Sequence, residues 1–279
     1  MYSLEKFENG LEYLFIKNDS TEAKIALQGA HIFEFKTNNE ELLWLSETSE
    51  FENAKAIRGG VPICWPSFGM NNPALPQHGF ARVMHFELLR VDEKDANTTE
   101  AVFKLVDSKE SRALWDYKFE LEVKFTISKK LTIELTTTNR DDKAFTLTQA
   151  LHSYFAISDI ANVSVQGLEG KPRFDALTNK TSLQNEEITF HEEFDSVFQE
   201  VQNEIVLKDT KRVIHIKNEN SSSVIVWNPW IEKCSRMSAM KPNAYKEFVC
   251  IESANAFEDF KVIEPNCSHT LKATLQLSQ

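Results

Sequence analysis

Residues 119–125, FELEVKF, alternate strictly between apolar and charged side chains. Successive side chains of a β-strand point to opposite faces, so this period of two predicts a strand with one buried and one solvated face. Residues 131–135, LTIEL, repeat the pattern, and residues 127–130 lie between the two runs. We therefore expect an antiparallel hairpin in the middle of the chain.

Segments of similar strand character recur along the chain, at residues 24–27, 100–106, 119–127, 131–137, 213–216 and 223–226. Helical signals are few. Residues 108–114 are expected to form about two turns of helix, capped by Asp107 or Ser108.

The order of these segments indicates the architecture. No linker rich in proline, glycine or serine divides the sequence and no internal repeat is visible, so we expect residues 1–279 to form a single domain. Many strands with few helices between them favour antiparallel sheets packed face to face over a parallel doubly wound sheet. The predicted fold is all-β, a large antiparallel β-sandwich with few short helices.

The charge balance limits the classes of partner. With 42 acidic and 31 basic residues the formal net charge is -11, and no block rich in lysine or arginine offsets it. This disfavours nucleic acid and anionic lipid as partners. Because salt screens charges beyond about 8 Å, a few local arginines could still bind a small phosphorylated ligand.

The sequence also bears on location and cofactors. The N-terminal residues show no basic start followed by an apolar stretch, and no apolar run approaches the roughly 18 residues that span a bilayer. We expect a cytoplasmic monomer with no membrane partner. The four cysteines lack CxxC spacing, so we expect free buried thiols and no metal site.

Two regions break the strand rhythm, residues 58–79 and residues 226–247. Long irregular segments in compact domains are usually functional or disordered, and these two are too rich in aromatic residues to be disordered. We expect them to form the rim of a pocket.

The first region and the residues after it hold candidate ligands for an anion. Arg58 and Arg82 each carry a planar fork of donors that matches a phosphate, and two such forks could hold a dianion without a metal. A solvated surface charge is the ordinary explanation of any single arginine. For Gln77 and His78, hydrogen bonding within the loop is the favoured explanation on spacing alone.

Three further residues could carry chemistry. His152 would share one face of a strand with Tyr154, where a lone histidine is more often structural than catalytic. Glu252 ends a hydrophobic strand, a position that can present a side chain to a pocket or to solvent. Asp195 lies among aromatic residues, where its carboxylate could accept hydrogen bonds from sugar hydroxyls or cap a turn.

Taken together, five runs resemble the galactose-mutarotase-like superfamily, and specifically the glucose-6-phosphate 1-epimerase (D-hexose-6-phosphate mutarotase) family. The runs lie at residues 58–69, 77–82, 151–155, 226–230 and 250–252, in an order and spacing that fit nearly the whole chain. The resemblance implies a β-supersandwich whose concave face binds a pyranose. It implies that His152 and Glu252 are the catalytic pair. It also implies a set of substrate-binding residues, in which the arginines bind the phosphate: Arg58, Gln77, His78, Arg82 and Asp195.

Such an enzyme would interconvert the α and β anomers of a hexose 6-phosphate without a cofactor. One group removes the proton of the C1 hydroxyl while another, on the opposite side, delivers a proton to the ring oxygen. With ordinary pKa values near 4.3 and 6.5, Glu252 would be the base and His152 the acid.

Two other functions remain open. A non-catalytic carbohydrate-binding sandwich would stack sugar rings on tryptophans, with Trp65, Trp227 and Trp230 as candidates. A glycoside hydrolase or lyase would need two carboxylates beside the scissile bond, which Asp195 and Glu252 could supply. Catalytic turnover of a free sugar phosphate distinguishes the epimerase from both.

Overall fold

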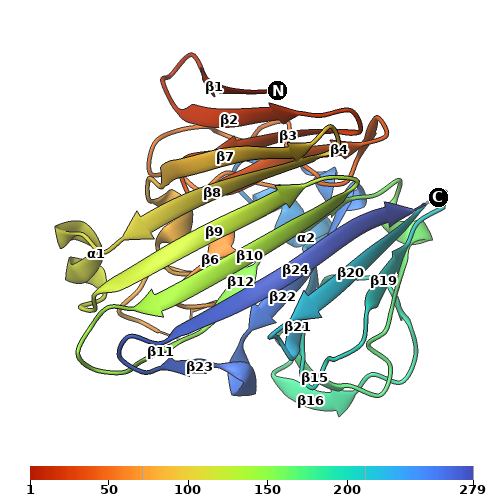
Figure 1. Ribbon diagram of the computed structural model, residues 1–279. Coiled ribbons are helices and arrows are strands. Elements are labelled where there is room, and N and C mark those ends of the chain that lie inside the picture. Colours follow the sequence, from red (N-terminus) through yellow and green to blue (C-terminus); the bar gives the residue numbers. More distant parts are fainter. Residues whose placement is uncertain (71, 211, 279) are drawn as a thin grey trace.

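The structure is a computed structural model that describes residues 1–70, 72–210 and 212–278. It consists mainly of antiparallel sheets, and the largest of them are packed face to face (Figure 1). The predicted all-β sandwich is therefore confirmed. No helix among the described residues is long and apolar enough to cross a membrane.

The outer sheet has the order β17-β14-β19-β20-β24-β10-β9-β8-β7, and its strands from β7 to β19 cross the front of Figure 1. Its strands are β7 (Glu87–Asp95), β8 (Thr98–Val106), β9 (Phe119–Ile127), β10 (Lys130–Asn139), β14 (Ser164–Gln166), β17 (Ile188–Thr189), β19 (Ile205–Lys208), β20 (Val213–Glu219) and β24 (Ser268–Ser278).

The predicted hairpin is the centre of this outer sheet. Strand β9 pairs with β10 from Ile127 opposite Leu131 to Phe119 opposite Asn139. Burial alternates along β9, with the apolar side chains buried and the polar ones partly exposed. The solvated face carries ion pairs between neighbouring strands, such as Lys124 with Glu134 at 2.7 Å. The strand with one buried and one solvated face, predicted from the alternation in the sequence, is therefore confirmed.

The inner sheet lies behind it in the order β16-β15-β18-β21-β22-β12-β6, and β13 also pairs with β22. Its strands are β6 (Ile63–Cys64), β12 (Gln149–Leu151), β13 (Tyr154–Ala156), β15 (Pro172–Asp175), β16 (Lys180–Leu183), β18 (Phe194–Phe198), β21 (Ser223–Asn228) and β22 (Phe248–Asn255).

Strand β22 is buried along its whole length because both of its faces are covered. On one face, Ser253 donates a hydrogen bond to Asn218 of the outer sheet, with 2.6 Å between Oγ and Oδ1. On the opposite face lies Glu252, since neighbouring residues of a strand point to opposite sides. This strand therefore contacts the core with one face and presents Glu252 on the far side of the inner sheet.

A third sheet is formed by the N-terminal residues, and a small pair of strands lies near the other end of the molecule (Figure 1). They comprise β1 (Tyr2–Lys6), β2 (Glu12–Lys17), β3 (Thr21–Ala26), β4 (His31–Thr37) and β5 (Glu40–Glu41), and the pair β11 (Phe145–Leu147) with β23 (Lys261–Ile263). The other predicted strands fall within β3, β8, β20 and β21, apart from Leu27, which follows β3.

The predicted helix is present as α1 (Lys109–Leu114). Its cap is Ser108, whose Oγ accepts a hydrogen bond from the backbone N–H of Ser111 at 3.2 Å. Short 3-10 segments occur elsewhere in the described chain, at Ala81–Val83, Ile160–Asn162, Ala244–Lys246 and Phe257–Asp259.

The expectation of an irregular segment at residues 226–247 is wrong in part. The segment begins in β21, continues as helix α2 (Trp230–Arg236) and ends in a 3-10 turn. Asn228 organises it, because its side chain accepts from the N–H of Trp230 and donates to the carbonyls of Tyr245 and Phe248. The helix is short, and the Asn228–Pro229 pair before it is as typical of a turn as of a helix start, so the sequence does not distinguish the two.

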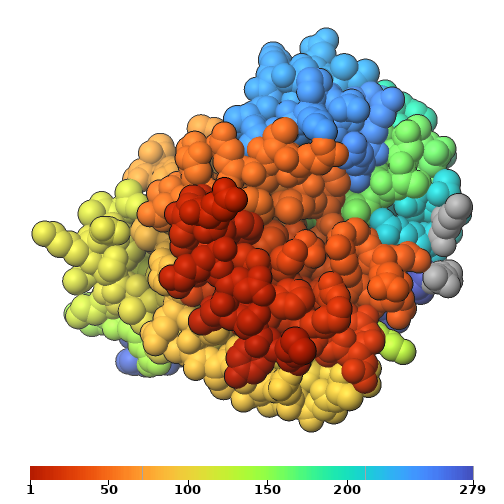
Figure 2. Space-filling model, turned by 90° about the horizontal axis from the view of Figure 1, so that it is seen from above, coloured from red at the N-terminus to blue at the C-terminus, as the bar shows by residue number. Residues whose placement is uncertain are grey.

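The segment around α2 lies beside the segment around residue 50 at the surface (Figure 2). An ion pair joins Lys241 to Glu47, and Trp44 donates from its indole N–H to Glu247 at 3.2 Å. Parts of the chain nearly 200 residues apart are thereby held together.

The cysteines agree only partly with the expectation of free buried thiols. Cys64, Cys234 and Cys250 are free and buried, but Cys267 is free and exposed. It lies in the turn that leads into β24, where the thiol faces solvent.

The predicted rim segment at residues 58–79 is fixed by close backbone contacts. Gly79 has a φ of 69°, and a Cβ at this position would lie 2.1 Å from the carbonyl oxygen of Trp65. Trp65 is fully buried, and its indole N–H donates to Thr137 of the outer sheet at 2.9 Å. The core thus fixes the position of the residues that precede Gly79.

We expect Gly79→Ala to lower the free energy of unfolding by about 3 kcal/mol or more, because it adds a steric clash to a backbone conformation that L-residues avoid. Gly170→Ala is the matched control, since its φ is 76° and no atom lies within 4 Å of its added Cβ. Urea unfolding followed by circular dichroism measures both. Equal losses in the two variants would contradict the close contact.

Candidate active site

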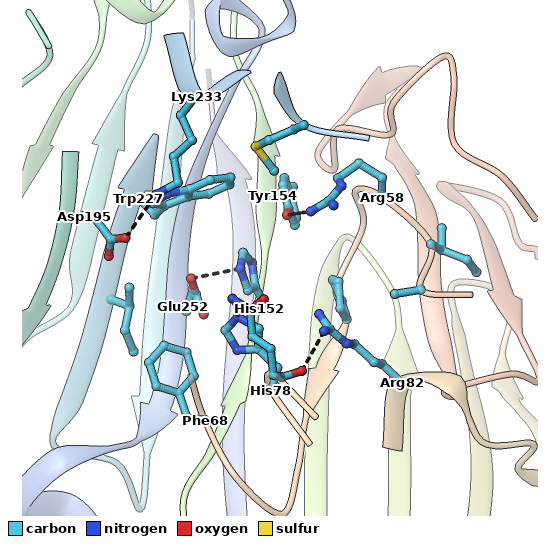
Figure 3. A pocket seen from close by; sticks show the side chains of 16 residues that line it. Arg58, Phe68, His78, Arg82, His152, Tyr154, Asp195, Trp227, Lys233 and Glu252 are labelled. Carbon is cyan, nitrogen blue, oxygen red and sulfur yellow. Dashed lines mark hydrogen bonds and ion pairs between the residues drawn. The ribbon is translucent and has the colours of Figure 1, made fainter. Parts of the chain in front are cut away.

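A cavity of 330 Å³ lies on the far side of the inner sheet, within the range of small-molecule sites (Figure 3). The structure brings all seven residues proposed from the sequence to this cavity. Its lining consists of Ala56, Ile57, Arg58, Pro62, Phe68, Gln77, His78, Arg82, His152, Tyr154, Asp195, Ile225, Trp227, Lys233, Met237 and Glu252.

The inner sheet places His152 beside Glu252. His152 follows β12 directly, in a break before β13, and its backbone N–H donates to the carbonyl of Pro62 at 3.0 Å. Strand β12 pairs with β22, which carries Glu252. The imidazole Nε2 and the carboxylate Oε1 are 3.3 Å apart (Figure 3). The two groups therefore contact each other, rather than lying on opposite sides of a ligand space as expected.

Both members of this pair are buried, with 8% of His152 and 2% of Glu252 exposed. Among the described residues, Glu252 Oε2 has no hydrogen-bond partner. A buried carboxylate oxygen without a partner is costly, and such atoms mark places where a ligand or water completes the site. The unsatisfied oxygen is thus a candidate contact for a substrate hydroxyl.

Burial also changes the acid–base properties expected from the ordinary pKa values. Desolvation raises the pKa of Glu252 well above its usual value, and the nearby charge of Asp195 raises it further. Desolvation lowers the pKa of His152 well below its usual value. A protonated His78 would act in the same direction, as do the charges of Arg82 and Arg58. In this structure the pair therefore favours a neutral imidazole and a protonated carboxyl group.

Tyr154 supports the imidazole of His152. The two rings are stacked, with 4.9 Å between centroids and 12° between planes. Its hydroxyl accepts a hydrogen bond from Arg58 at 3.4 Å. The predicted common orientation of His152 and Tyr154 is therefore present, although a break in the strand separates the two residues.

Arg58 and Arg82 lie on one side of the acid–base pair (Figure 3). The Arg82 guanidinium donates to the carbonyl of Gln77 at 2.7 Å. Burial lowers the pKa of His78 to about 3, and the charges of Arg82 and Arg58 act in the same direction. His78 is therefore neutral near pH 7 and can serve as a hydrogen-bond donor or acceptor.

Asp195 and Lys233 lie on the other side of the pair (Figure 3). Asp195 Oδ2 is 3.7 Å from Lys233 Nζ, and the Lys233 ammonium lies 5.8 Å from the ring centroid of Trp227. Burial raises the pKa of Asp195, whereas the charge of Lys233 lowers it. Sequence reasoning missed Lys233, because its only signal is a position shortly after the tryptophan-rich run in a helix that was not predicted.

The three candidate tryptophans have different positions. Trp227 lines the cavity, whereas Trp65 is fully buried in the core. Trp230 packs on Tyr245, with 5.2 Å between ring centroids, and is not part of the cavity lining. A row of stacking platforms for sugar rings is therefore not formed by these three residues.

Comparison with known proteins agrees with this geometry. The family model described as aldose 1-epimerase matches residues 12–276. A protein of Escherichia coli named "Putative glucose-6-phosphate 1-epimerase" is 36% identical over 265 residues, which cover 93% of this chain and 88% of that protein. A relative with the same name from Cenchrus ciliaris is 34% identical over 266 residues, covering 90% and 80% of the two chains.

Solved structures show the same fold. The crystal structure of a provisionally named mutarotase from Salmonella typhimurium has a TM-score of 0.93 at 33% identity and covers 100% of this chain and 94% of that chain. Galactose 1-epimerase from Lactobacillus acidophilus is 12% identical and shares the fold with a TM-score of 0.76, covering 100% and 98% of the two chains. The chain therefore belongs to the aldose 1-epimerase family, a family of isomerases.

Proposed function

We propose that this protein interconverts the α and β anomers of a D-hexose 6-phosphate, with glucose 6-phosphate as the expected substrate. The contact between His152 and Glu252 carries the proposal, because it places two proton-exchanging groups together in a cavity that also holds two arginines. The names of the relatives support the choice of a phosphorylated hexose.

The reaction needs one proton acceptor and one proton donor. The acceptor removes the proton from the C1 hydroxyl, the C1–ring-oxygen bond breaks, and the donor protonates the ring oxygen. This leaves an open-chain aldehyde. Rotation about the C1–C2 bond presents the other face of the carbonyl, and ring closure reverses the two proton transfers. Both exchanging oxygens are bonded to C1, so two adjacent side chains can serve them.

The buried pair can exist in two forms with the same number of protons. An ionised Glu252 with an imidazolium ring would act as base and acid, as expected from the sequence. A protonated Glu252 with a neutral His152 would act in the opposite roles. Ring opening converts one form into the other, because the acceptor gains a proton and the donor loses one. The neutral form favoured by burial is therefore one of the two states in the cycle.

A bound phosphate would change the balance between these forms. The charges of Arg58 and Arg82 both lower the pKa of His152. A phosphate dianion held by these guanidinium groups would offset their charge and raise the pKa of His152. Substrate binding would thus favour the imidazolium form that donates a proton to the ring oxygen.

Local charge makes phosphate binding compatible with an acidic protein. Arg58, Arg82 and Lys233 line the cavity. The carboxyl groups that oppose them there are Asp195 and Glu252, and burial raises the pKa of Glu252, which disfavours its charged form. Carboxylates beyond about 8 Å are screened by salt. The alternative of a hydrolase with two carboxylates has less support, because the direct partner of Glu252 is His152 and not Asp195.

We expect Glu252→Gln to reduce anomer exchange of glucose 6-phosphate by about 10²–10⁴-fold, the usual contribution of a positioned acid–base group. Exchange NMR measures the rate, and ligand-observed NMR checks that the sugar phosphate still binds. A variant with near-normal turnover would remove Glu252 from the mechanism.

The same substitution tests the raised pKa of Glu252. A folded pKa above the unfolded value of about 4.5 means that stability is lost as the pH rises from 4.5 toward the folded pKa. Glutamine cannot ionise and avoids this loss. Relative to wild type, we expect Glu252→Gln to gain about 1 kcal/mol or more between about pH 5 and pH 8, because a tenfold change in proton affinity on folding corresponds to about 1.4 kcal/mol. A pH-independent difference in urea unfolding would contradict the raised pKa.

We expect Arg82→Ala to lower kcat/KM for glucose 6-phosphate by about 10–100-fold, because it removes charge-assisted hydrogen bonds to the phosphate. The rate with unphosphorylated glucose should change little. Arg90→Ala, on the exposed face of β7, is the matched control and should leave both rates unchanged. Equal losses for glucose and glucose 6-phosphate in Arg82→Ala would argue against a phosphate site at this arginine.

A further inference from the structure

Lys233 reaches the cavity from an element outside the sheets. It lies in α2 and extends past the ring of Trp227 toward Asp195 of β18 (Figure 3). Its ammonium is 2.8 Å from Glu193 Oε1 and 3.7 Å from Asp195 Oδ2. The short contact with Glu193 fixes the lysine head group, while the longer one leaves donor capacity beside Asp195.

The surroundings of Asp195 explain why a cation is needed there. Its carboxylate is about three-quarters buried, with 28% of the side chain exposed. The anions found to act on it are Glu193 and Asp175, and both oppose its ionisation. Lys233 is the cation that faces Asp195 among the groups found to act on it in the described chain. Without Lys233, Asp195 would be a desolvated carboxylate among like charges.

The covalent structure of a pyranose indicates which part of the sugar would face this pair. C1 has two ring neighbours, the ring oxygen and C2. The 6-phosphate is attached through C5 and C6 on the side of the ring oxygen. In the proposed function the acid–base pair acts at C1 and the arginines hold the phosphate on one side of the pair. The cavity wall on the other side, away from the arginines, then faces C2. Asp195 and Lys233 form that wall (Figure 3).

We propose that Lys233 is a specificity-determining residue, which holds the Asp195 carboxylate in place and, together with it, provides a hydrogen-bond donor and an acceptor for the C2 hydroxyl of the sugar. A hydroxyl both donates and accepts, so an adjacent carboxylate and ammonium satisfy it fully. This inference rests on the proposed hexose-phosphate epimerase activity and assigns the residues that recognise C2.

The test compares glucose 6-phosphate with 2-deoxyglucose 6-phosphate in wild type and in Lys233→Met. We expect the variant to lose about tenfold in kcat/KM for glucose 6-phosphate, since it loses a charged hydrogen bond, and to change little with the 2-deoxy sugar. Exchange NMR gives both rates. An equal loss with the two sugars, or a loss confined to phosphorylated over unphosphorylated glucose, overturns the proposal.

Three further variants make the result specific to this lysine. Lys233→Arg keeps the charge and should restore most of the preference for the C2 hydroxyl. Arg236→Met removes an exposed cation from the same helix, outside the cavity lining, and should leave the preference unchanged. If Lys233→Met is too unstable to assay, Asp195→Asn should show the same loss of preference. Retained preference in Asp195→Asn would also overturn the proposal.

The pH profile separates this role from a purely structural one. Removing the ammonium raises the pKa of Asp195, so the acid limb of kcat/KM in Lys233→Met should move to higher pH. Lys233→Arg should keep the wild-type limb. An unchanged limb in Lys233→Met contradicts the coupling. Wild-type exchange of glucose 6-phosphate no faster than in buffer would instead overturn the proposed function, independently of Lys233.

Discussion

The site depends on the burial of a histidine against a glutamate on neighbouring segments of one sheet. His152 and Glu252 are in contact, and little of either side chain reaches solvent. In water their ordinary pKa values would favour an ion pair. Removal from water disfavours both charges and brings the energies of the charged and neutral forms closer together. A pair that can hold its protons in either arrangement suits a reversible reaction in which donor and acceptor exchange roles.

The sandwich provides the rigidity for this contact. Strand β22 packs against the outer sheet on one face and presents Glu252 to the cavity on the other. The core therefore sets the position of Glu252. The remaining groups come from less regular elements: the loop with Arg58, the 3-10 turn with Arg82 and the helix with Lys233. We interpret this division as a fixed proton-transfer pair surrounded by loops that recognise the substrate.

The sequence predicted the architecture well where a local pattern reports burial. The alternation at residues 119–125 identified β9, and a side-chain cap identified α1. Residue patterns alone could not identify the catalytic candidates: a structural role was favoured for His152 and equally good for Glu252. Only the resemblance across five runs indicated a catalytic role. Helix α2 and Lys233 were missed because long-range hydrogen bonds from Asn228 stabilise that segment. The altered pKa values also depend on burial, which no local pattern reports.

The most direct test of the central claim is the rate of anomer exchange of glucose 6-phosphate, measured by exchange NMR at increasing concentrations of the wild-type protein. The account predicts a rate that rises linearly above the spontaneous rate, with a larger second-order rate constant for glucose 6-phosphate than for glucose. A rate that stays at the spontaneous value for both sugars at every protein concentration would contradict it.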